Sequence, residues 1–359
     1  MARGLPPLAG LKVVDFSTLL PGPFASLLLA EAGAEVIKVE RPGTGDDMRA
    51  YEPRFGDESA IFSLLNRGKT SMALDLKDQA DKEIALSLMR EADIVIEQFR
   101  PGVMARLGLS YEDLAKDNPG LIYCSITGYG QTGPNALRAA HDLNYVAETG
   151  MLSLVTGADG APVLPPVPLA DLGGGAYPAF MNILLALQGR ARDGNGAHLD
   201  IAMTDNVFPF LYWALASGFV GDWPRPDAAL ITGGSPRYAF YRTKDARYLA
   251  AAPLEDKFWA NFCAVLGLDV TADRDAVAGA VAAEDSAALI RRLEQLDTCC
   301  SIVATVEEAV ASMQVKSRGL LDRGIENANG AIPALPSPIV EAFRATELRA
   351  PPALGQHPI

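Results

Sequence analysis

The sequence predicts an α/β layer fold followed by a smaller α+β domain. Over the first half of the chain, short β-rich runs alternate with helical periodicity, which is typical of strands covered by helices. The 359 residues correspond to about two domains at roughly 150 residues each. The composition, 49% hydrophobic and 21% charged, provides material for sizeable cores and excludes a predominantly disordered chain.

Apolar runs in the first half predict strands, and helices connect some of them. The predicted strands are residues 11–16, 34–40, 71–76, 94–99 and 121–127. A helix over 21–31 begins at a Pro-Gly-Pro sequence, because proline suits a first helical turn, and it ends before Gly33. A second helix spans 78–91. Strands separated by helices favour parallel pairing with right-handed crossovers.

The second half begins with an irregular region over 132–168, rich in Gly, Pro and Ala, and such regions often carry function. The segments that follow predict a helix over 176–189, a strand over 198–203, a helix over 205–218, a linker within 221–234, a hairpin of 238–242 and 248–252, and helices near 257–266, 286–296 and 306–313. A proline-rich tail over 332–359 predicts an extended segment.

The charge and residue counts exclude several classes of function. With 31 basic and 44 acidic residues the net charge is −13, so the chain offers no basic field for nucleic acid or an anionic membrane. Three histidines (His141, His198 and His357) and four cysteines without a C-x-x-C pair argue against a structural zinc site or a disulfide framework. No apolar run approaches the ~20 residues of a membrane span, and no signal peptide stands out, so we expect a cytoplasmic protein.

The first strand, helix and second strand, which ends at Glu40, are typical of a dinucleotide-binding unit. The turn over 17–23 nevertheless lacks the G-x-G-x-x-G fingerprint whose backbone holds a pyrophosphate. We therefore expect no nicotinamide cofactor.

Two segments contain the residues best suited to acid–base chemistry. The first holds His141 in the sequence AHDLNY, where the alternative is a solvated loop histidine or one bonded to its neighbour. The second holds Asp171 just ahead of three glycines, where the alternative is a helix N-cap. In the functional interpretation the glycines allow a substrate close to the backbone, and the helix N-terminus supplies donors for an oxyanion.

These and other segments, in their order over residues 11–260, resemble the family III CoA-transferases (CaiB/BaiF type), and within them the α-methylacyl-CoA racemase branch. The matching stretches include LKVVDFSTLLPGPFASLLLAEAGAEVIKVERPGTGD, FRPGVMARLGL, NPGLIYCSITGYGQTGP, HDLNYVAETG and LADLGGGA. The sequence departs from the racemases at Ala140, where they commonly have glycine, and in a C-terminal tail that is shorter than theirs.

The resemblance implies a Rossmann-like large domain and a small domain in an interlocked homodimer, with an acyl-CoA substrate and no metal or redox cofactor. On this basis we place a large CoA-binding domain at 1–205, a linker at 206–225, a small domain at 226–325 and a C-terminal return to the large domain at 326–359.

The resemblance also implies site residues. His141 and Asp171 match the proton-transfer pair of the racemases, and Glu255 matches a carboxylate that reaches the histidine from the small domain of the other subunit. For Glu255 the alternative is an acid that complements a helix dipole. The expected CoA contacts are Arg41, Leu74, Asp75, Leu76, Lys77, Arg100, Ala140, Asp142, Leu143, Asn144 and Tyr145. Because cations suit a phosphate-bearing ligand, Arg67 and Lys69 are further candidates, with solvated surface charges as the alternative.

Three functions stay open at this point. The first is racemisation of 2-methyl-branched acyl-CoA thioesters by two-base proton transfer through an enolate, with amides after Asp171 directed at the thioester oxygen. The second is CoA transfer with Asp171 as the nucleophile that forms an aspartyl-CoA mixed anhydride. The third is CoA binding without catalysis. The transferase members generally lack the histidine, so His141 favours the racemase.

Overall fold

The computed structural model describes residues 5–157, 159–345 and 350–357 of the chain. The chain has a mixed α/β fold with a central parallel sheet, and it divides into two compact units. The first unit comprises Met1–Thr149, Pro165–Phe210 and Gly319–Ile359, and the second comprises Gly150–Leu164 and Leu211–Arg318.

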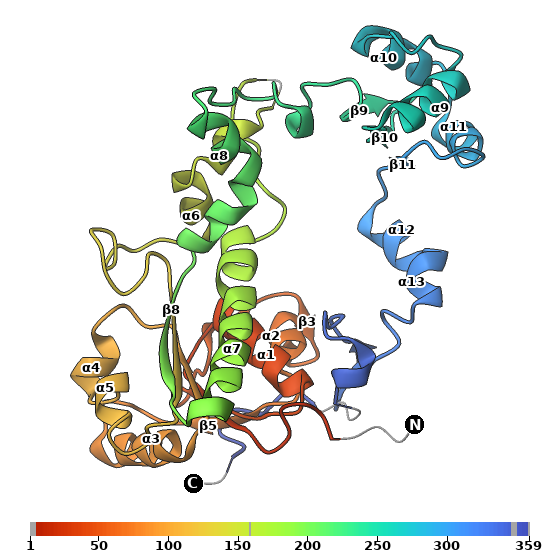
Figure 1. Ribbon diagram of the computed structural model, residues 1–359. Coiled ribbons are helices and arrows are strands. Elements are labelled where there is room, and N and C mark those ends of the chain that lie inside the picture. The colour runs from red at the N-terminus through yellow and green to blue at the C-terminus, as the bar shows by residue number, and fades with distance from the viewer. Residues whose placement is uncertain (1–4, 158, 346–349, 358–359) are drawn as a thin grey trace. The chain divides into compact units, whose positions relative to one another are not determined.

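The first unit is built on a six-stranded sheet in the order β5-β2-β1-β6-β7-β8 (Figure 1). Every neighbouring pair in this sheet is parallel. The strands are β1 (Lys12–Asp15), β2 (Glu35–Glu40), β5 (Thr70–Ala73), β6 (Ile94–Glu97), β7 (Ile122–Thr127) and β8 (Ala197–Ala202). The strands predicted from apolar runs are confirmed to within three residues at each end. The chain leaves β1 toward β2 on one side and later returns to β6 on the other side, so the strand order reverses between β1 and β6.

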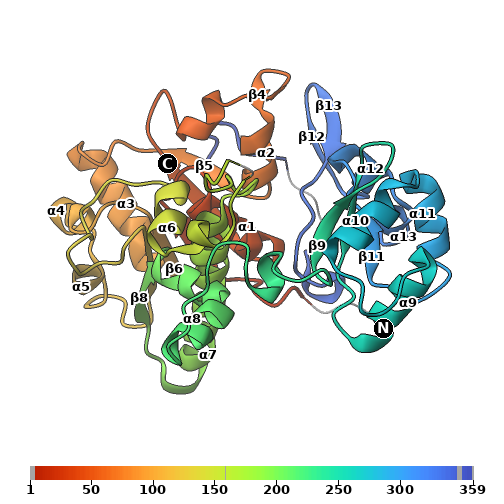
Figure 2. The same cartoon turned by 90° about the horizontal axis from the view of Figure 1, so that it is seen from above.

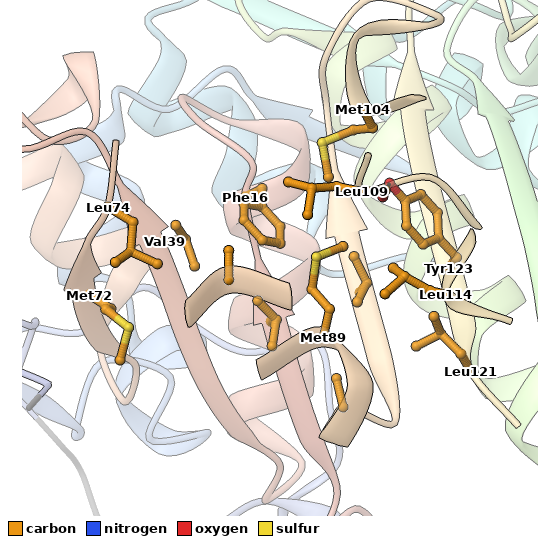
Figure 3. Close-up of a cluster of buried hydrophobic side chains, with 14 residues drawn as sticks. Phe16, Val39, Met72, Leu74, Met89, Met104, Leu109, Leu114, Leu121 and Tyr123 are labelled. Atoms are coloured by element: carbon orange, nitrogen blue, oxygen red, sulfur yellow. Dashed lines mark hydrogen bonds between the residues drawn. The ribbon is translucent and has the colours of Figure 1, made fainter. Parts of the chain in front are cut away.

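Helices cover both faces of this sheet (Figure 2). Helix α1 (Pro21–Glu31) contacts β1, β2 and β6, and α7 (Tyr177–Asp193) contacts β7 and β8. On the opposite face, α3 (Gln79–Glu91), α4 (Val103–Leu107) and α5 (Tyr111–Leu114) enclose a buried apolar layer (Figure 3). Because side chains alternate along a strand, Val14 and Phe16 point into that layer, whereas Asp15 points toward α1 and bonds its Ser26.

The remaining regular elements of the first unit are short. They are α2 (Ala60–Asn66), α6 (Asp142–Glu148), a π-helix (Ala170–Ala176), the antiparallel pair β3 (Arg54–Phe55) and β4 (Glu58–Ser59), the antiparallel pair β12 (Gly324–Asn327) and β13 (Gly330–Pro333), and 3₁₀ turns at Asp47–Ala50, Asp205–Leu211 and Glu341–Phe343. Residues near the C-terminus return to the sheet edge, where the backbone N–H of His357 donates to the carbonyl of Ser71 in β5.

The second unit contains a three-stranded antiparallel sheet in the order β11-β10-β9. Its elements are β9 (Ala239–Arg242), β10 (Tyr248–Ala251), β11 (Cys300–Ile302), α8 (Tyr212–Phe219), α9 (Asp256–Leu266), α10 (Arg274–Ala282), α11 (Ser286–Leu293), α12 (Val306–Ala311), α13 (Met313–Ser317) and 3₁₀ turns at Met151–Leu154 and Leu230–Thr232. Trp259 and Phe262 of α9 pack with α10 and α11 against the sheet and form its core. The predicted hairpin is confirmed.

The structure differs from the sequence prediction at several helices. Helix α10 was not predicted, although Asp273 is an N-cap that accepts a hydrogen bond from the backbone N–H of Ala276. The region over 132–168 contains α6 and is therefore not wholly irregular. The helix predicted from 176 is confirmed as α7, but a π-helix at Ala170 precedes it. Among the described residues, no helix is both long and apolar enough to cross a bilayer.

Substitution of Gly174 by alanine is expected to lower the free energy of unfolding by about 1–3 kcal/mol, because an added methyl group overpacks the site. A Cβ at Gly174 would lie 2.3 Å from the carbonyl oxygen of Met203, a backbone atom directly after β8. Gly189 in α7 is the matched control, since a Cβ there meets nothing within 4 Å. Gly189→Ala should raise stability by roughly 0.5–1 kcal/mol. Urea unfolding measures both, and equal effects of the two substitutions would contradict this account of the packing.

Candidate active site

A pocket of about 410 Å³ lies in the first unit, where the carboxyl ends of β1, β6, β7 and β8 meet. Its lining residues follow these strands or come from two segments laid over them: Leu19, Pro21, Gln98, Phe99, Arg100, Pro101, Ile126, Thr127, Gly128, Ala136, Arg138, Ala139, Ala140, His141, Asn144, Tyr145, Asp171 and Met203. In open α/β sheets, ligands bind in the crevice where the strand order reverses. Here that reversal lies between β1 and β6, so the pocket occupies the expected position.

The turn between β1 and α1 forms one wall of the pocket. A buried ion pair, Lys38 with Asp46, fixes the backbone of this turn. Leu19 adopts a left-handed backbone with φ of 62°, which is uncommon for a residue other than glycine. Its N–H donates to both carboxylate oxygens of Asp46, at 3.1 and 3.2 Å. Asp46 in turn pairs with Lys38 at 2.9 Å, and both of these side chains are fully buried. The surrounding charges therefore maintain an unusual backbone conformation beside the pocket.

His141 enters the pocket at the N-cap of α6. The backbone around it is fixed, because the His141 N–H donates to Oδ1 of Asn144 at 3.0 Å and the Asn144 N–H donates to the His141 carbonyl at 2.8 Å. Its imidazole is exposed and makes no hydrogen bond with any residue that the structure describes. The alternative of a histidine bonded to its neighbour is therefore wrong, and the ring nitrogens are available to a ligand.

Asp171 reaches the same pocket from the second position of the π-helix. Burial, and to a smaller extent the neighbouring carboxylate of Asp142, raise the pKa of Asp171 to about 7. A carboxyl group with such a pKa exchanges its proton readily near neutral pH.

Asp142 caps the start of the π-helix, a role that the alternative interpretation gave to Asp171. Its Oδ1 accepts hydrogen bonds from the backbone N–H of Ala170 at 2.6 Å and of Asp171 at 3.0 Å. The interpretation of Asp171 as an N-cap is therefore wrong, since its own side chain makes no capping bond. Asp142 instead fixes the start of the helix that carries Asp171.

The glycines after Asp171 pack closely against other parts of the chain. An added Cβ would lie 2.3 Å from the Met203 carbonyl oxygen at Gly174, 2.9 Å from the Phe210 ring at Gly173 and 3.0 Å from the Pro21 side chain at Gly175. These positions are therefore glycine because protein atoms approach them closely. The amide of Leu172, the first after Asp171, donates to the carbonyl of Pro168 at 3.1 Å and is therefore not free for a thioester oxygen. For the other amides after Asp171, that role stays a prediction.

Tyr145 lines the same pocket as the two candidate acid–base residues and is buried. Its hydroxyl donates to the Ala140 carbonyl at 2.8 Å, and its ring packs edge-on against Tyr129. Burial raises the pKa of Tyr145 to about 12, with a smaller contribution from the charge of Asp171. Its ring occupies the space where a side chain at residue 128 would lie, which explains Gly128.

The predicted CoA contacts fall into two groups. Arg100, Ala140, Asn144 and Tyr145 line the pocket, whereas Leu143, which is exposed, and Asp142 belong to α6 beside it. The other group follows β2 and β5 and does not line the pocket: it comprises Arg41, Leu74, Asp75, Leu76 and Lys77.

The members of the second group differ in how accessible their side chains are. Arg41 and Lys77 are exposed, although Arg41 pairs with Asp47. The Leu74 side chain is buried in the apolar layer, and Asp75 accepts a hydrogen bond from the Lys77 N–H. Only the exposed cations of this group therefore offer side chains to a phosphate.

Arg67 and Lys69 are buried structural charges, so the expectation that they bind CoA is wrong. Arg67 pairs with Glu31 at 2.9 Å and is 3% exposed. Lys69 donates to the Pro23 carbonyl and to Oδ1 of Asn66, both at 2.8 Å. Neither the guanidinium of Arg67 nor the ammonium of Lys69 is therefore free to bind a ligand.

Glu255 lies in the second unit, at the N-cap of α9, and its side chain makes no capping bond. Its predicted role toward His141 stays a prediction.

Several residues that line the pocket were not predicted, and Leu19, Gln98 and Arg138 are among them. Gln98 directly follows β6, and its Oε1 accepts a hydrogen bond from the Gly22 N–H at the start of α1. The sequence could have identified Gln98 as a pocket residue, because it follows a predicted strand and ligands bind at the carboxyl ends of parallel strands.

Asp171→Asn should become more stabilising as the pH rises. A carboxyl whose folded-state pKa lies near 7, against 3.8 when unperturbed, binds its proton more tightly in the folded protein. Its contribution to stability is therefore present below pH 4 and is lost as the pH rises through 7. Urea unfolding at pH 5 and pH 8 should show a larger stability gain for the variant at pH 8. A gain that does not change with pH would contradict the raised pKa.

Both the sequence and the fold of this chain are similar to those of known proteins. The sequence matches the model of CoA-transferase family III over residues 8–358. It is 48% identical to acetyl-CoA:oxalate CoA-transferase of Acetobacter aceti over 210 residues, which is 58% of this chain and about half (54%) of that enzyme. It is 31% identical to human alpha-methylacyl-CoA racemase over 366 residues, covering 98% of this chain and 91% of the racemase.

The fold is similar to that of a CAIB/BAIF family protein from Brucella suis, seen in a crystal structure. The TM-score is 0.84 at 31% sequence identity, and the match covers 99% of this chain and 98% of the other.

Proposed function

The chain belongs to CoA-transferase family III, and from that premise we propose that it racemises 2-methyl-branched acyl-CoA thioesters. The observation that carries this proposal is the pairing of His141 and Asp171 in one pocket, with the pKa of Asp171 near 7. The full-length similarity to a racemase supports it. An acyl-CoA is the substrate class common to the family.

The chemistry needs two groups that exchange protons with opposite faces of the α-carbon. One group removes the α-proton, and the electron pair of the broken C–H bond forms an enolate with the thioester carbonyl. The other group then returns a proton to the opposite face, which inverts the centre. In the reverse direction the roles exchange. Asp171 can serve in both roles near neutrality because its protonated and ionised forms are both populated there.

The enolate oxygen needs a hydrogen-bond donor. In our proposal Asn144 supplies it, because its Oδ1 is already used by the His141 N–H and its amide Nδ2 therefore stays available. Asp142 acts as a positioning residue, since it holds the first turn of the helix that bears Asp171.

A second candidate is CoA transfer, favoured by the 48% identity to an acetyl-CoA:oxalate CoA-transferase. In this reaction the ionised carboxylate of Asp171 attacks the thioester carbonyl and expels the CoA thiolate. An aspartyl mixed anhydride forms, and an acceptor acid is required to complete turnover. His141 has no necessary role in this scheme.

We further propose that the protein is a homodimer, as its family resemblance implies. Helix α7 presents an exposed apolar stripe at Tyr177, Met181, Leu184 and Leu185, and such a stripe on one helix face favours a protein contact. Sedimentation equilibrium measures the mass directly, and a monomer would contradict this part of the proposal.

Incubation with a 2-methylacyl-CoA in deuterated water separates the candidate functions. Deuterium that enters the α-position without any acceptor acid supports racemisation. Turnover that depends on an acceptor, together with an enzyme intermediate that hydroxylamine traps, would replace it by CoA transfer. Tight CoA binding without either reaction would leave a binding protein.

A further inference from the structure

Four buried charged side chains contact the start of α1 and the turn that precedes it, and they take no part in the proposed reaction. Asp15, Lys38, Asp46 and Lys69 are each at most 3% exposed. Lys38 pairs with Asp46 at 2.9 Å, and Lys69 lies 3.6 Å from Asp15. Because the cost of desolvating two charges offsets most of their attraction, such pairs are weak evidence of stabilisation. Their hydrogen bonds to the backbone indicate a different role.

Three of these side chains bond the backbone of the turn between β1 and α1. Oδ1 of Asp15 accepts a hydrogen bond from the Ser17 N–H at 2.9 Å, and the Lys38 ammonium donates to the Ser17 carbonyl at 2.7 Å. Asp46 accepts from the Leu19 N–H with both carboxylate oxygens. Buried charges therefore bind both backbone polar groups of Ser17 and the N–H of Leu19, and such hydrogen bonds are stronger than those between neutral groups.

Leu19 is the residue of this turn that depends most on these bonds. Its φ of 62° lies in the left-handed region, which glycine adopts freely and which an L side chain resists. Both oxygens of Asp46 are already shared: Oδ2 lies 2.9 Å from the Lys38 ammonium, and Oδ1 also accepts from the Met48 N–H at 3.0 Å. An amide at position 46 would have only one acceptor oxygen and would direct its NH₂ group at one of these donors.

The turn contributes to the pocket in two ways. Leu19 and Pro21 line it directly. Pro21 also packs against the π-helix that carries Asp171, since a Cβ at Gly175 would lie only 3.0 Å from the Pro21 side chain. Because closely packed segments transmit displacements to one another, a change in the backbone of the turn would alter the pocket wall and shift the helix that bears Asp171.

We propose that Asp46 is a positioning residue for acyl-CoA binding, because it keeps Leu19 in the left-handed conformation that shapes the pocket wall. The inference rests on the proposed function only in its choice of an acyl-CoA as the ligand of the pocket. When the carboxylate of Asp46 is lost, Leu19 returns to a conformation that leucine prefers, and the pocket wall moves with it. Asp46 does not line the pocket and acts through Leu19.

The test is a double-mutant cycle of Asp46→Asn and Leu19→Gly, with the affinity for 2-methylbutanoyl-CoA measured by calorimetry. Asp46→Asn alone should weaken binding about tenfold or more, the size expected for loss of a hydrogen bond to a charged group. In the Leu19→Gly background the same substitution should weaken binding less than about twofold, because glycine keeps the left-handed conformation without Asp46. A loss of fold would weaken binding in both backgrounds alike.

A second variant leaves the buried charges intact. Leu19→Ile preserves the size and the apolar character of the side chain, but a β-branched residue resists a left-handed backbone more strongly than leucine. It should weaken binding of 2-methylbutanoyl-CoA by more than about twofold. Asp57→Asn is the matched control for Asp46→Asn, because Asp57 is an exposed aspartate that does not line the pocket. It should leave the affinity unchanged.

Two results would overturn the inference. Equal weakening by Asp46→Asn in both backgrounds would show that Asp46 does not act through Leu19. Unchanged affinity in Asp46→Asn and in Leu19→Ile would make the left-handed turn irrelevant to binding. The proposed reaction fails separately: wild-type protein that binds 2-methylbutanoyl-CoA and shows this coupling, but exchanges no α-proton in deuterated water, retains the inference and loses the racemase activity.

Discussion

Replacement of Asp171 by asparagine is expected to lower the rate of racemisation by about 10²–10⁴-fold, the usual contribution of a general acid–base residue. Asparagine preserves the size of the side chain, and the backbone N–H of residue 171 can still donate to Asp142. The variant therefore loses the exchangeable proton and little of the local structure. Polarimetry of a single enantiomer of a 2-methylacyl-CoA measures the rate.

Asp193 provides the control for this substitution, since it is an exposed aspartate at the end of α7 and does not line the pocket. Asp193→Asn should leave the rate unchanged. If Asp171→Asn retained more than about a tenth of the wild-type rate, well above the residual activity expected after loss of a general base, Asp171 would not be one of the two bases.

His141→Gln should produce a loss of similar size, about 10²–10⁴-fold, in racemisation. The His141 imidazole is free of hydrogen bonds to any described residue, so its removal breaks no internal contact. The same variant should retain any CoA transfer from acyl-CoA to an acceptor acid, because attack by Asp171 on a thioester needs no second base. Parallel assays of the two reactions in the variant therefore distinguish the two chemistries.

The control for His141 is His198, an exposed histidine on β8 whose Nε2 lies 3.0 Å from the Ser125 hydroxyl. His198→Gln should leave racemisation unchanged. A His141→Gln variant that racemises at the wild-type rate would leave CoA transfer as the better account.

The sheet and the helices that cover it were largely predictable from the sequence. Continuous apolar runs, such as Ile94–Glu97 and Ile122–Thr127, are buried on both faces, and this is the pattern of a parallel strand. The Pro-Gly-Pro start of α1 identified its first turn correctly. These elements carry their signals within a few residues, so no knowledge of distant contacts is needed.

The roles of individual charged and small residues were less predictable, because they depend on contacts between distant segments. Lys69 resembles any surface cation in the sequence, yet its ammonium is buried beside Asp15 at 3.6 Å. Asp142 is separated by 28 residues from the amide of Ala170 that it caps. The three glycines after Asp171 avoid collisions with Met203 and its neighbours, which no local pattern indicates.

The position of Leu19 is an example of a site feature that only the folded chain explains. A leucine gives no local signal for a left-handed backbone, and the cause lies in Asp46 and Lys38, which are far from it in the sequence. Such conformations cost about 1–3 kcal/mol and persist where the surrounding structure maintains them, often beside functional sites.

Exchange of the α-proton in deuterated water, followed for each enantiomer separately, tests the two-base proposal most directly. Two bases on opposite faces of the α-carbon each remove the proton from one enantiomer only. Wild-type protein should exchange the proton of both enantiomers, Asp171→Asn that of one, and His141→Gln that of the other. Loss of exchange for the same enantiomer in both variants, or exchange of both enantiomers by either variant, would contradict the assignment of His141 and Asp171 to opposite faces.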